Sequence, residues 1–322
     1  MPLSRRQILA SLAATALPAA LPSVARAQTA LPVVATTGMI ADTARAIGGD
    51  LVEVQALMGP GVDPHSYRQT RSDIAAMTRA GQILANGLYL EAQMEDILDQ
   101  LARRVPVARV AEALPDSVLM DFEGHAGRHD PHVWMDPGLW AGVAEGIAAT
   151  LTERLPGAAD RLAANTLAVT GLYDRLSAYA AEVLGSVPDS ARVLVTAHDA
   201  FGYFGRAFGL EVVGIQGIST ESEAGLNRIG ALVGMLAERR IAAVFVESSV
   251  SDRNIRALIE GAAARGHEVT IGGELFSDAM GASGSYEGTY PGMIDHNVTT
   301  IARALGGQAP ERGMDGRLGG AA

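Results

Sequence analysis

Two series of alternating strand-like and helix-like segments, separated by a long helical stretch, constrain the fold of this chain most. Before residue 156 and again after residue 191, short β-rich runs alternate with amphipathic segments, with about four strand–helix units in each series. Such alternation is typical of a parallel sheet covered by helices. We therefore predict an α/β fold of two β/α lobes, each with a four-stranded parallel sheet, joined by a single long rigid helix.

The segment between the two series predicts that rigid connection. Its apolar residues recur at helical spacing over 158–184, and Pro156 and Pro188 flank it with no proline in between. A helix of this length differs from the Gly/Ser linkers that allow wide hinge motion. The predicted organisation is an N-terminal lobe over 28–156, a connecting helix over 157–187, a C-terminal lobe over 188–307 and a flexible tail over 308–322.

The first 27 residues have the pattern of an export signal. Ser4-Arg5-Arg6 precedes an apolar, alanine-rich run, and Ala25-Arg26-Ala27 supplies a small-residue cleavage site. The paired arginines are typical of the twin-arginine type. We expect cleavage after Ala27 and a soluble periplasmic product. A short membrane anchor is the alternative, which Pro18 and Pro22 disfavour because they interrupt an already short run.

Charge and cysteine content exclude several classes of function. The net charge is −11, and loss of the three arginines before residue 28 would make it more negative, so a nucleic-acid partner is not expected. The chain contains no cysteine, which excludes thiolate metal ligands, thiol nucleophiles and a lipid-anchored N-terminal cysteine. An exported protein of this length can build its core without disulfides.

Four polar side chains occupy turns of a similar kind. His65 and His132 each end an Asp-Pro-His turn, while His198 and Asp278 each follow a predicted strand of the second series. The carboxyl ends of parallel strands are where open α/β sheets bind ligands. Three imidazoles and one carboxylate suit Zn²⁺, and each lobe would contribute two of them. Each residue also has an ordinary structural alternative, such as a turn or helix cap for Asp278.

The segments around these residues resemble the metal-specific solute-binding proteins of ABC importers, the zinc/manganese group and its TroA-like branch. The motifs are Gly-Val-Asp-Pro-His65-Ser-Tyr, Asp-Pro-His132-Val-Trp-Met-Asp-Pro, Thr-Ala-His198-Asp-Ala-Phe-Gly-Tyr-Phe and Gly-Gly-Glu-Leu-Phe-Ser-Asp278-Ala-Met-Gly. The resemblance covers essentially the whole chain after residue 27. It implies that His65, His132, His198 and Asp278 hold one metal ion in an interlobe cleft, and that a monomer delivers the ion to an ABC permease in the inner membrane.

The choice of metal stays open between two ions. The donor set favours Zn²⁺, with Mn²⁺ a close second. Some zinc-specific relatives carry a long histidine-rich loop before the second ligand, whereas residues 122–129 contain only His125 and His129. Manganese-type relatives often place a glutamate where this chain has His198. Candidates for orienting the imidazoles from outside the ligand set are Asn86, Asp136 and Glu247.

Two other functions remain as alternatives, a zinc-dependent hydrolase and a metal-binding surface adhesin. A catalytic zinc keeps an open position for water, whereas four protein ligands would close the site, and no His-Glu-x-x-His motif is present. The expected free periplasmic state disfavours an adhesin. If delivery is the function, we expect lobe or loop rearrangement around the cleft rather than wide hinge bending, because the connector is a stiff helix.

Overall fold

The computed structural model describes residues 29–122 and 127–319. The predicted export signal, His125 and the last three residues lie outside this range. None of the helices within it is long and apolar enough to cross a membrane.

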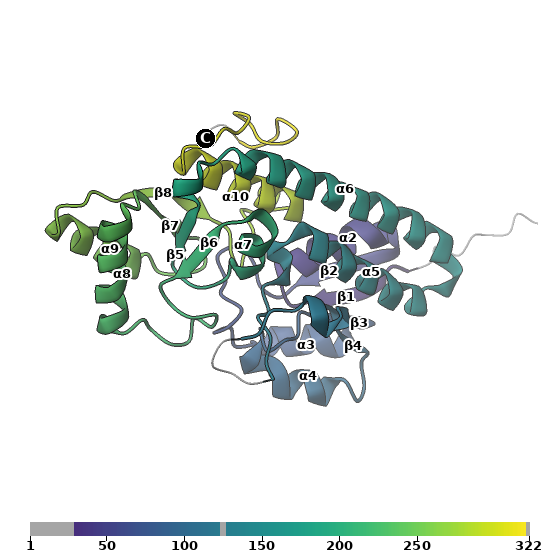
Figure 1. Ribbon diagram of the computed structural model, residues 1–322. Coiled ribbons are helices and arrows are strands. Elements are labelled where there is room, and N and C mark those ends of the chain that lie inside the picture. Colours follow the sequence, from purple (N-terminus) through teal and green to yellow (C-terminus); the bar gives the residue numbers. More distant parts are fainter. Residues whose placement is uncertain (1–28, 123–126, 320–322) are drawn as a thin grey trace, which may run out of the picture.

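The first half contains one four-stranded parallel sheet with the strand order β2-β1-β3-β4. Its strands are β1 (Leu31–Ala35), β2 (Val52–Ala56), β3 (Gln82–Ala85) and β4 (Val107–Arg109). Its helices are α2 (Gly38–Gly48), α3 (Arg71–Arg79), α4 (Glu95–Leu101) and α5 (Pro137–Arg154). The inner strands β1 and β3 are parallel neighbours, so their carboxyl ends lie side by side. These ends face the second half (Figure 1).

The second half also has four parallel strands, but they form two hydrogen-bonded pairs instead of the single sheet that we predicted. The pairs are β5 (Val193–Thr196) with β6 (Glu211–Gly214), and β7 (Ala243–Glu247) with β8 (Thr270–Leu275). The two pairs share one apolar core. The side chain of Glu247, at the end of β7, connects the two pairs. Its Oε1 accepts a hydrogen bond of 2.9 Å from the backbone N–H of His198, which follows β5.

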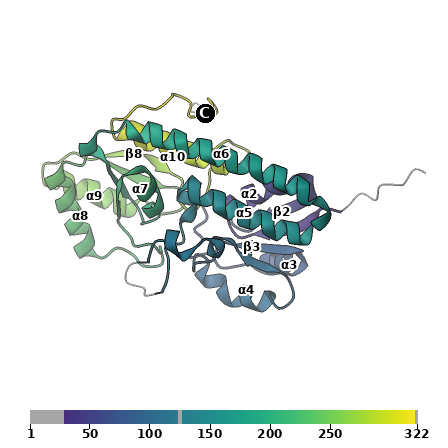
Figure 2. The same ribbon diagram turned by 45° about the vertical axis from the view of Figure 1, so that its right-hand side comes forward.

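Four helices complete the second half, namely α7 (Gly202–Phe208), α8 (Leu226–Arg239), α9 (Arg253–Ala264) and α10 (Tyr290–Ala304). Helices α8 and α9 cover the outer side, and α10 lies on the side that faces the first half (Figures 1 and 2). Beyond α10 the chain folds back, and the backbone N–H of Met314 donates to both oxygens of Asp295 at 3.0 Å.

One long helix, α6 (Ala159–Gly185), connects the halves and packs on both of them. It runs beside α5 and α2 at one end and beside α10 at the other (Figure 2). Tyr173 of α6 and Tyr290 of α10 have ring centroids 4.8 Å apart, and a single apolar core continues along the helix from one half to the other. The connector is therefore packed over its length, as a rigid element would be.

Candidate metal centre

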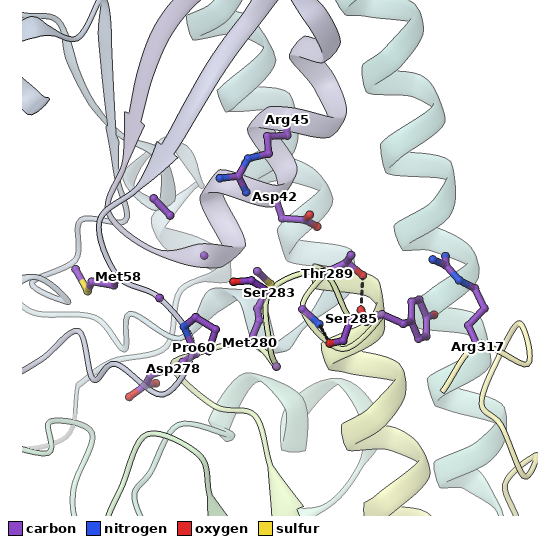
Figure 3. Close-up of a pocket in the computed structure, with 18 residues that line it drawn as sticks. Asp42, Arg45, Met58, Pro60, Asp278, Met280, Ser283, Ser285, Thr289 and Arg317 are labelled. Carbon is purple, nitrogen blue, oxygen red and sulfur yellow. Dashed lines mark hydrogen bonds between the residues drawn. The ribbon is translucent and has the colours of Figure 1, made fainter. Parts of the chain in front are cut away.

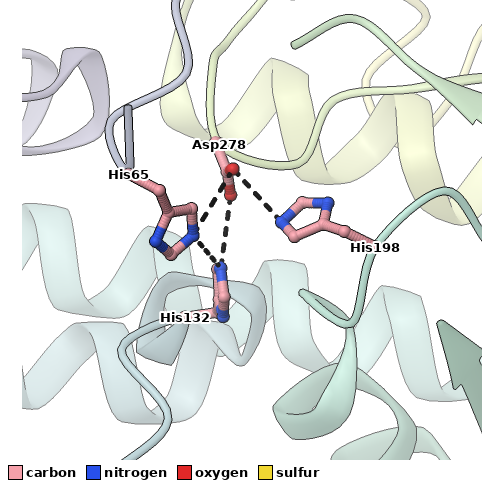
Figure 4. Close-up of side chains that lie close together, drawn as sticks. All are labelled: His65, His132, His198 and Asp278. Atoms are coloured by element: carbon pink, nitrogen blue, oxygen red, sulfur yellow. Dashed lines mark hydrogen bonds and ion pairs between the residues drawn. The ribbon is translucent and has the colours of Figure 1, made fainter. Parts of the chain in front are cut away.

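His65, His132, His198 and Asp278 meet between the two halves, and all four are buried. One ligand-type atom from each lies within 4.8 Å of the others. The Nε2 atoms of His65 and His132 are 3.2 Å apart, and Asp278 Oδ2 is 3.2 Å from His198 Nε2. Figure 4 shows the three rings and the carboxylate pointing toward one common point.

Each side chain reaches this point from the end of a strand or the start of a helix. His65 follows β2 through a turn that contains Pro64, and His132 precedes a 3-10 turn that continues into α5. His198 follows β5, and Asp278 follows β8. The two halves therefore contribute two side chains each. Their positions match the binding region of open parallel sheets, outside the carboxyl ends of the strands.

Two buried carboxylates hold the outer nitrogens of two rings. His132 Nδ1 lies 2.7 Å from Asp130 Oδ1, and His198 Nδ1 lies 2.6 Å from Glu247 Oε2. A carboxylate only accepts hydrogen bonds, so both Nδ1 atoms must carry the hydrogen. In the neutral ring, Nε2 then presents a lone pair to the centre. This carboxylate–histidine arrangement is the one that orients imidazoles at metal sites.

Three of the atoms at the centre have no hydrogen-bond partner among the described residues. His198 Nε2 and both carboxylate oxygens of Asp278 are buried without a hydrogen bond, although nitrogens lie 3.2 to 3.8 Å away. An unpaired carboxylate away from water costs several kcal/mol. The fourth and fifth atoms of the centre, Nε2 of His65 and Nε2 of His132, are hydrogen-bonded to each other at 3.2 Å. A cation at the common point would satisfy all of them.

Aromatic residues fix the segment that carries the carboxylate. The indole N–H of Trp134 donates to the backbone oxygen of Ser277 at 2.8 Å, directly before Asp278. The hydroxyl of Tyr290 in turn donates to the backbone oxygen of Trp134 at 2.8 Å. Because Trp134 lies two residues after His132, the same indole connects two of the four side chains.

Protons compete with a cation for these atoms. Burial opposes protonation of His132, but the carboxylates of Asp130 and Asp278 outweigh it and raise the pKa of His132 to about 9. Asp278 and Glu247 likewise raise the pKa of His198 against the effect of burial. Burial alone dominates at His65, where it lowers the pKa to about 4. Burial also disfavours the charge of Asp278, yet His198 and His132 hold its pKa well below the usual range.

The separations of these atoms fit one small ion. Ligands about 2.0 to 2.1 Å from a tetrahedral Zn²⁺ lie roughly 3.3 Å from one another. Three contacts, of 3.2, 3.2 and 3.4 Å, are close to that edge length, with His132 facing one oxygen of Asp278 and His198 the other. The contact between His65 Nε2 and Asp278 Oδ2 is longer, at 3.8 Å. The four ligand-type atoms lie within 4.8 Å of one another, so some of them would have to move closer together when an ion binds.

The three residues predicted to orient the imidazoles from outside the ligand set have different contacts in the structure. The prediction for Glu247 is confirmed by its contact with the His198 ring. The one for Asp136 is wrong, because its carboxylate caps α5 and accepts from the backbone N–H of Gly138 at 2.9 Å. Asn86 acts only indirectly, through a 3.2 Å hydrogen bond from its amide to the backbone oxygen of Pro131.

Asp130 was not predicted from the sequence, and His129 lies outside the group of four side chains. Asp130 holds the His132 ring, and its signal in the sequence is the repeated Asp-Pro-His tripeptide, in which the aspartate precedes the ligand by two positions. His129 lies 3.9 Å from Asp121 and is not part of the four-residue group.

Two cavities border the centre. A cavity of about 270 Å³ is lined by His65 together with residues from both halves. Another, of about 500 Å³, lies between α2 and the segment after Asp278 (Figure 3). At its edge the carboxylate of Asp42 in α2 accepts from the backbone N–H of Tyr290 at 2.8 Å. This contact connects the two halves beside the segment that carries Asp278.

Comparisons with known proteins place these features in context. The family model described as zinc-uptake complex component A, periplasmic, matches residues 33–304. The chain is 46% identical to the manganese-binding lipoprotein MntA of Bacillus subtilis (strain 168), over 85% of this chain and 90% of that protein. It is 45% identical to the zinc-binding protein TroA of Treponema pallidum (strain Nichols), over 85% of this chain and 88% of that protein.

The fold has close counterparts among solved structures. The periplasmic zinc-binding protein TroA from Treponema pallidum superposes with a TM-score of 0.84 at 44% identity, covering 86% of this chain and 99% of that one. Fe(III)-bound YtgA from Chlamydia trachomatis superposes with a TM-score of 0.77 at 26% identity, covering 88% of this chain and all of that one. Both support an α/β architecture with parallel strands and a long helix.

Proposed function

Because this chain belongs to the family of zinc-uptake complex component A, periplasmic, we propose that His65, His132, His198 and Asp278 capture one divalent transition-metal ion. Relatives in the same comparison are named as substrate-binding lipoproteins of metal and manganese ABC transporters. The chain is accordingly a metal-binding solute-binding protein of an ABC importer and not an enzyme. The hydrolase and adhesin alternatives gain no support from these relatives.

The observation that carries the assignment of the four ligands is the unpaired, buried carboxylate of Asp278 facing three imidazole nitrogens. Asp130 and Glu247 fix two rings so that their lone pairs face inward. Without an ion, protons on His132 and His198 have to balance this buried carboxylate, and a cation bound at the common point would take their place. Structural tetrahedral zinc sites have this closed form, with every position taken by a protein ligand.

We propose Zn²⁺ as the preferred ion, with Mn²⁺ second. A site of three nitrogens and one carboxylate favours Zn²⁺ because affinities for divalent first-row metals rise from Mn²⁺ toward Cu²⁺ and remain high at Zn²⁺. A bidentate Asp278 would supply the additional oxygen that suits Mn²⁺. The relatives fit either ion, since one similar protein is named for manganese and another for zinc.

The partner of the chain is a membrane transporter, and we propose that a monomer delivers the ion to the permease subunit in the inner membrane. Similar proteins are described as periplasmic or as lipoproteins. For this chain we propose a free periplasmic state, since it has no cysteine to carry a lipid and has an Ala-Arg-Ala site before residue 28. We also propose that the N-terminal lobe ends at residue 156 and that the C-terminal lobe begins at residue 188.

A competition experiment tests the function and the metal preference together. Isothermal titration of the chelator-treated protein with Zn²⁺, and then with Mn²⁺ against Zn²⁺, should give one ion per chain and tighter binding of Zn²⁺. Asp278→Ala should abolish stoichiometric binding. Asp136→Ala is the matched control, because this carboxylate caps α5 and does not face the centre. Absence of stoichiometric binding of any divalent metal would overturn the proposal, and tighter Mn²⁺ would overturn the preference.

A further inference from the structure

A loop of the second half reaches the first half beside the metal centre. Residues 215–225, here called the β6–α8 loop, connect β6 to α8. The hydroxyl of Thr220 donates to Asp63 Oδ2 at 2.7 Å, and the amide of Gln93 donates to Glu221 Oε1 at 2.5 Å. Two consecutive loop residues are thus hydrogen-bonded to the opposite half.

Asp63 also belongs to the turn that carries His65. Its Oδ1 accepts from the backbone N–H of His65 at 2.9 Å, and its Oδ2 accepts from the hydroxyl of Ser66 at 2.8 Å. One carboxylate therefore fixes the backbone of a candidate ligand and binds the loop of the other half. A movement of Thr220 away from Asp63 would remove a hydrogen bond from the group that shapes the His65 turn.

The same loop forms part of the wall of the 270 Å³ cavity that reaches His65. Ile218 and Ser219 line it from the loop, and Leu88 and Tyr89 line it from the first half. Leu88 and Tyr89 both have positive φ, 55° and 64°, a conformation that side chains with a Cβ seldom adopt. The two walls belong to different halves, so separating them would widen the way to His65.

Few bonds of its own hold the loop in place. In the part of the chain that the structure describes, residues 218–224 make no backbone-to-backbone hydrogen bond. Within the second half, Glu223 accepts from Arg253 at 2.9 Å and, more weakly, from Asn254 at 3.3 Å and Gln216 at 3.4 Å. Against the first half, the loop is held by the side-chain bonds of Thr220 and Glu221. Segments with few backbone hydrogen bonds open at low free energy.

We propose that Asp63 and Thr220 form an interlobe latch that retains the metal ion, so that breaking their hydrogen bond is the step that frees His65 and opens its cavity. This inference rests on the proposed function and adds to it residues that control release. Asp63 and Thr220 are positioning residues, because they act on the ion through His65 and the β6–α8 loop. The latch explains how a packed connector can coexist with release of a buried ion, since only a loop has to move.

The test compares zinc release from four proteins. Each is loaded with one Zn²⁺ and mixed with excess chelator in a stopped-flow instrument, and association is measured separately. Thr220→Val removes the hydroxyl but keeps the shape, and should speed release roughly tenfold, as expected for losing a hydrogen bond to a charged acceptor. Thr220→Ser keeps the hydroxyl and should restore slow release. Thr270→Val is the control, because its hydroxyl bonds Ala242 on an exposed part of β8.

The outcomes separate the latch from the proposed function. If the wild-type protein binds no zinc, the proposed function fails, and the latch fails with it. If all four proteins bind one zinc and Thr220→Val releases it at the wild-type rate, only the latch is overturned. If Thr220→Ser releases zinc as fast as Thr220→Val, the latch is also overturned, because the hydroxyl would then have no effect on release. Gln93→Leu, which removes the neighbouring bond from the other half, should accelerate release in the same direction if the latch is correct.

Discussion

The two Asp-Pro-His turns have the same sequence and the same backbone hydrogen bond but serve their histidines differently. In both, the aspartate accepts from the backbone N–H of the histidine at 2.9 Å. Asp130 Oδ1 also reaches the ring of His132, with a 2.7 Å contact to Nδ1. Asp63 instead turns its second oxygen to Ser66 and Thr220, and no described residue bonds Nδ1 of His65.

The electrostatics follow this difference in partners. His132 lies between two carboxylates, which raise its pKa to about 9 in spite of burial. His65 has no carboxylate against its ring nitrogen Nδ1, and burial lowers its pKa to about 4. His132 is fully enclosed, whereas His65 lines a cavity. If the four residues bind an ion as proposed, His132 is therefore the fixed ligand of the centre and His65 is the ligand next to the cavity.

The largest effect should come from removing the fixed ligand. His132→Ala leaves the charge of Asp130 buried without its partner and removes one nitrogen from the enclosed side, so we expect loss of stoichiometric zinc binding. His65→Ala should weaken binding less, because water from the cavity can take the empty position. Isothermal titration of both variants measures the difference. Equal losses in the two variants would contradict the distinction between the two histidines.

A smaller effect is expected from the carboxylate that orients the fixed ligand. Asp130→Asn keeps the backbone hydrogen bond but removes the charge beside His132, and should weaken zinc binding roughly 10- to 100-fold. Asp136→Asn is the matched control, since an asparagine also caps a helix and this residue does not touch the centre. Unchanged affinity in Asp130→Asn would show that the contact with His132 does not support metal binding.

The smallest effect concerns pH. Raising the pKa of His132 from 6.5 to about 9 means that the chelator-treated protein holds a proton there until the pH rises through about 9. Zinc must displace that proton, so affinity should increase with pH, by about tenfold per unit for each proton displaced. The proton itself stabilises the chelator-treated protein below pH 6.5, and this contribution is lost as the pH rises through about 9.

Titrations in buffers with different ionisation enthalpies count the released protons. We expect His65→Ala to release as many protons as the wild-type protein, because the lowered pKa of His65 leaves it neutral at pH 7. His132 should account for one of them. Zinc binding to the wild-type protein without proton release would contradict these pKa directions.

The sequence predicted the local positions well and the partners of side chains poorly. His65, His132, His198 and Asp278 could be proposed because strand ends and turns are visible in local patterns, and the structure brings them together. Asp130 and Asp136 both precede a proline, and only the folded chain shows that one faces a ring while the other caps a helix. That choice depends on side-chain torsions and on neighbours distant in the sequence.

The fold shows the same limit. Helix α6 was predictable because its apolar spacing and flanking prolines are local signals. The division of the second sheet into two pairs was not, because pairing between β5 and β7 depends on long-range geometry. The latch residue Thr220 was equally hidden, since its partner Asp63 lies 157 positions away.

The central claim is that four side chains hold one ion, and anomalous diffraction tests it most directly. Crystals of the protein loaded with zinc, measured on both sides of the zinc absorption edge, should show one strong anomalous peak per chain. That peak should lie about 2.0 to 2.2 Å from Nε2 of His65, His132 and His198 and from an Asp278 oxygen. A peak at any other place, or none between the two halves, would contradict the account.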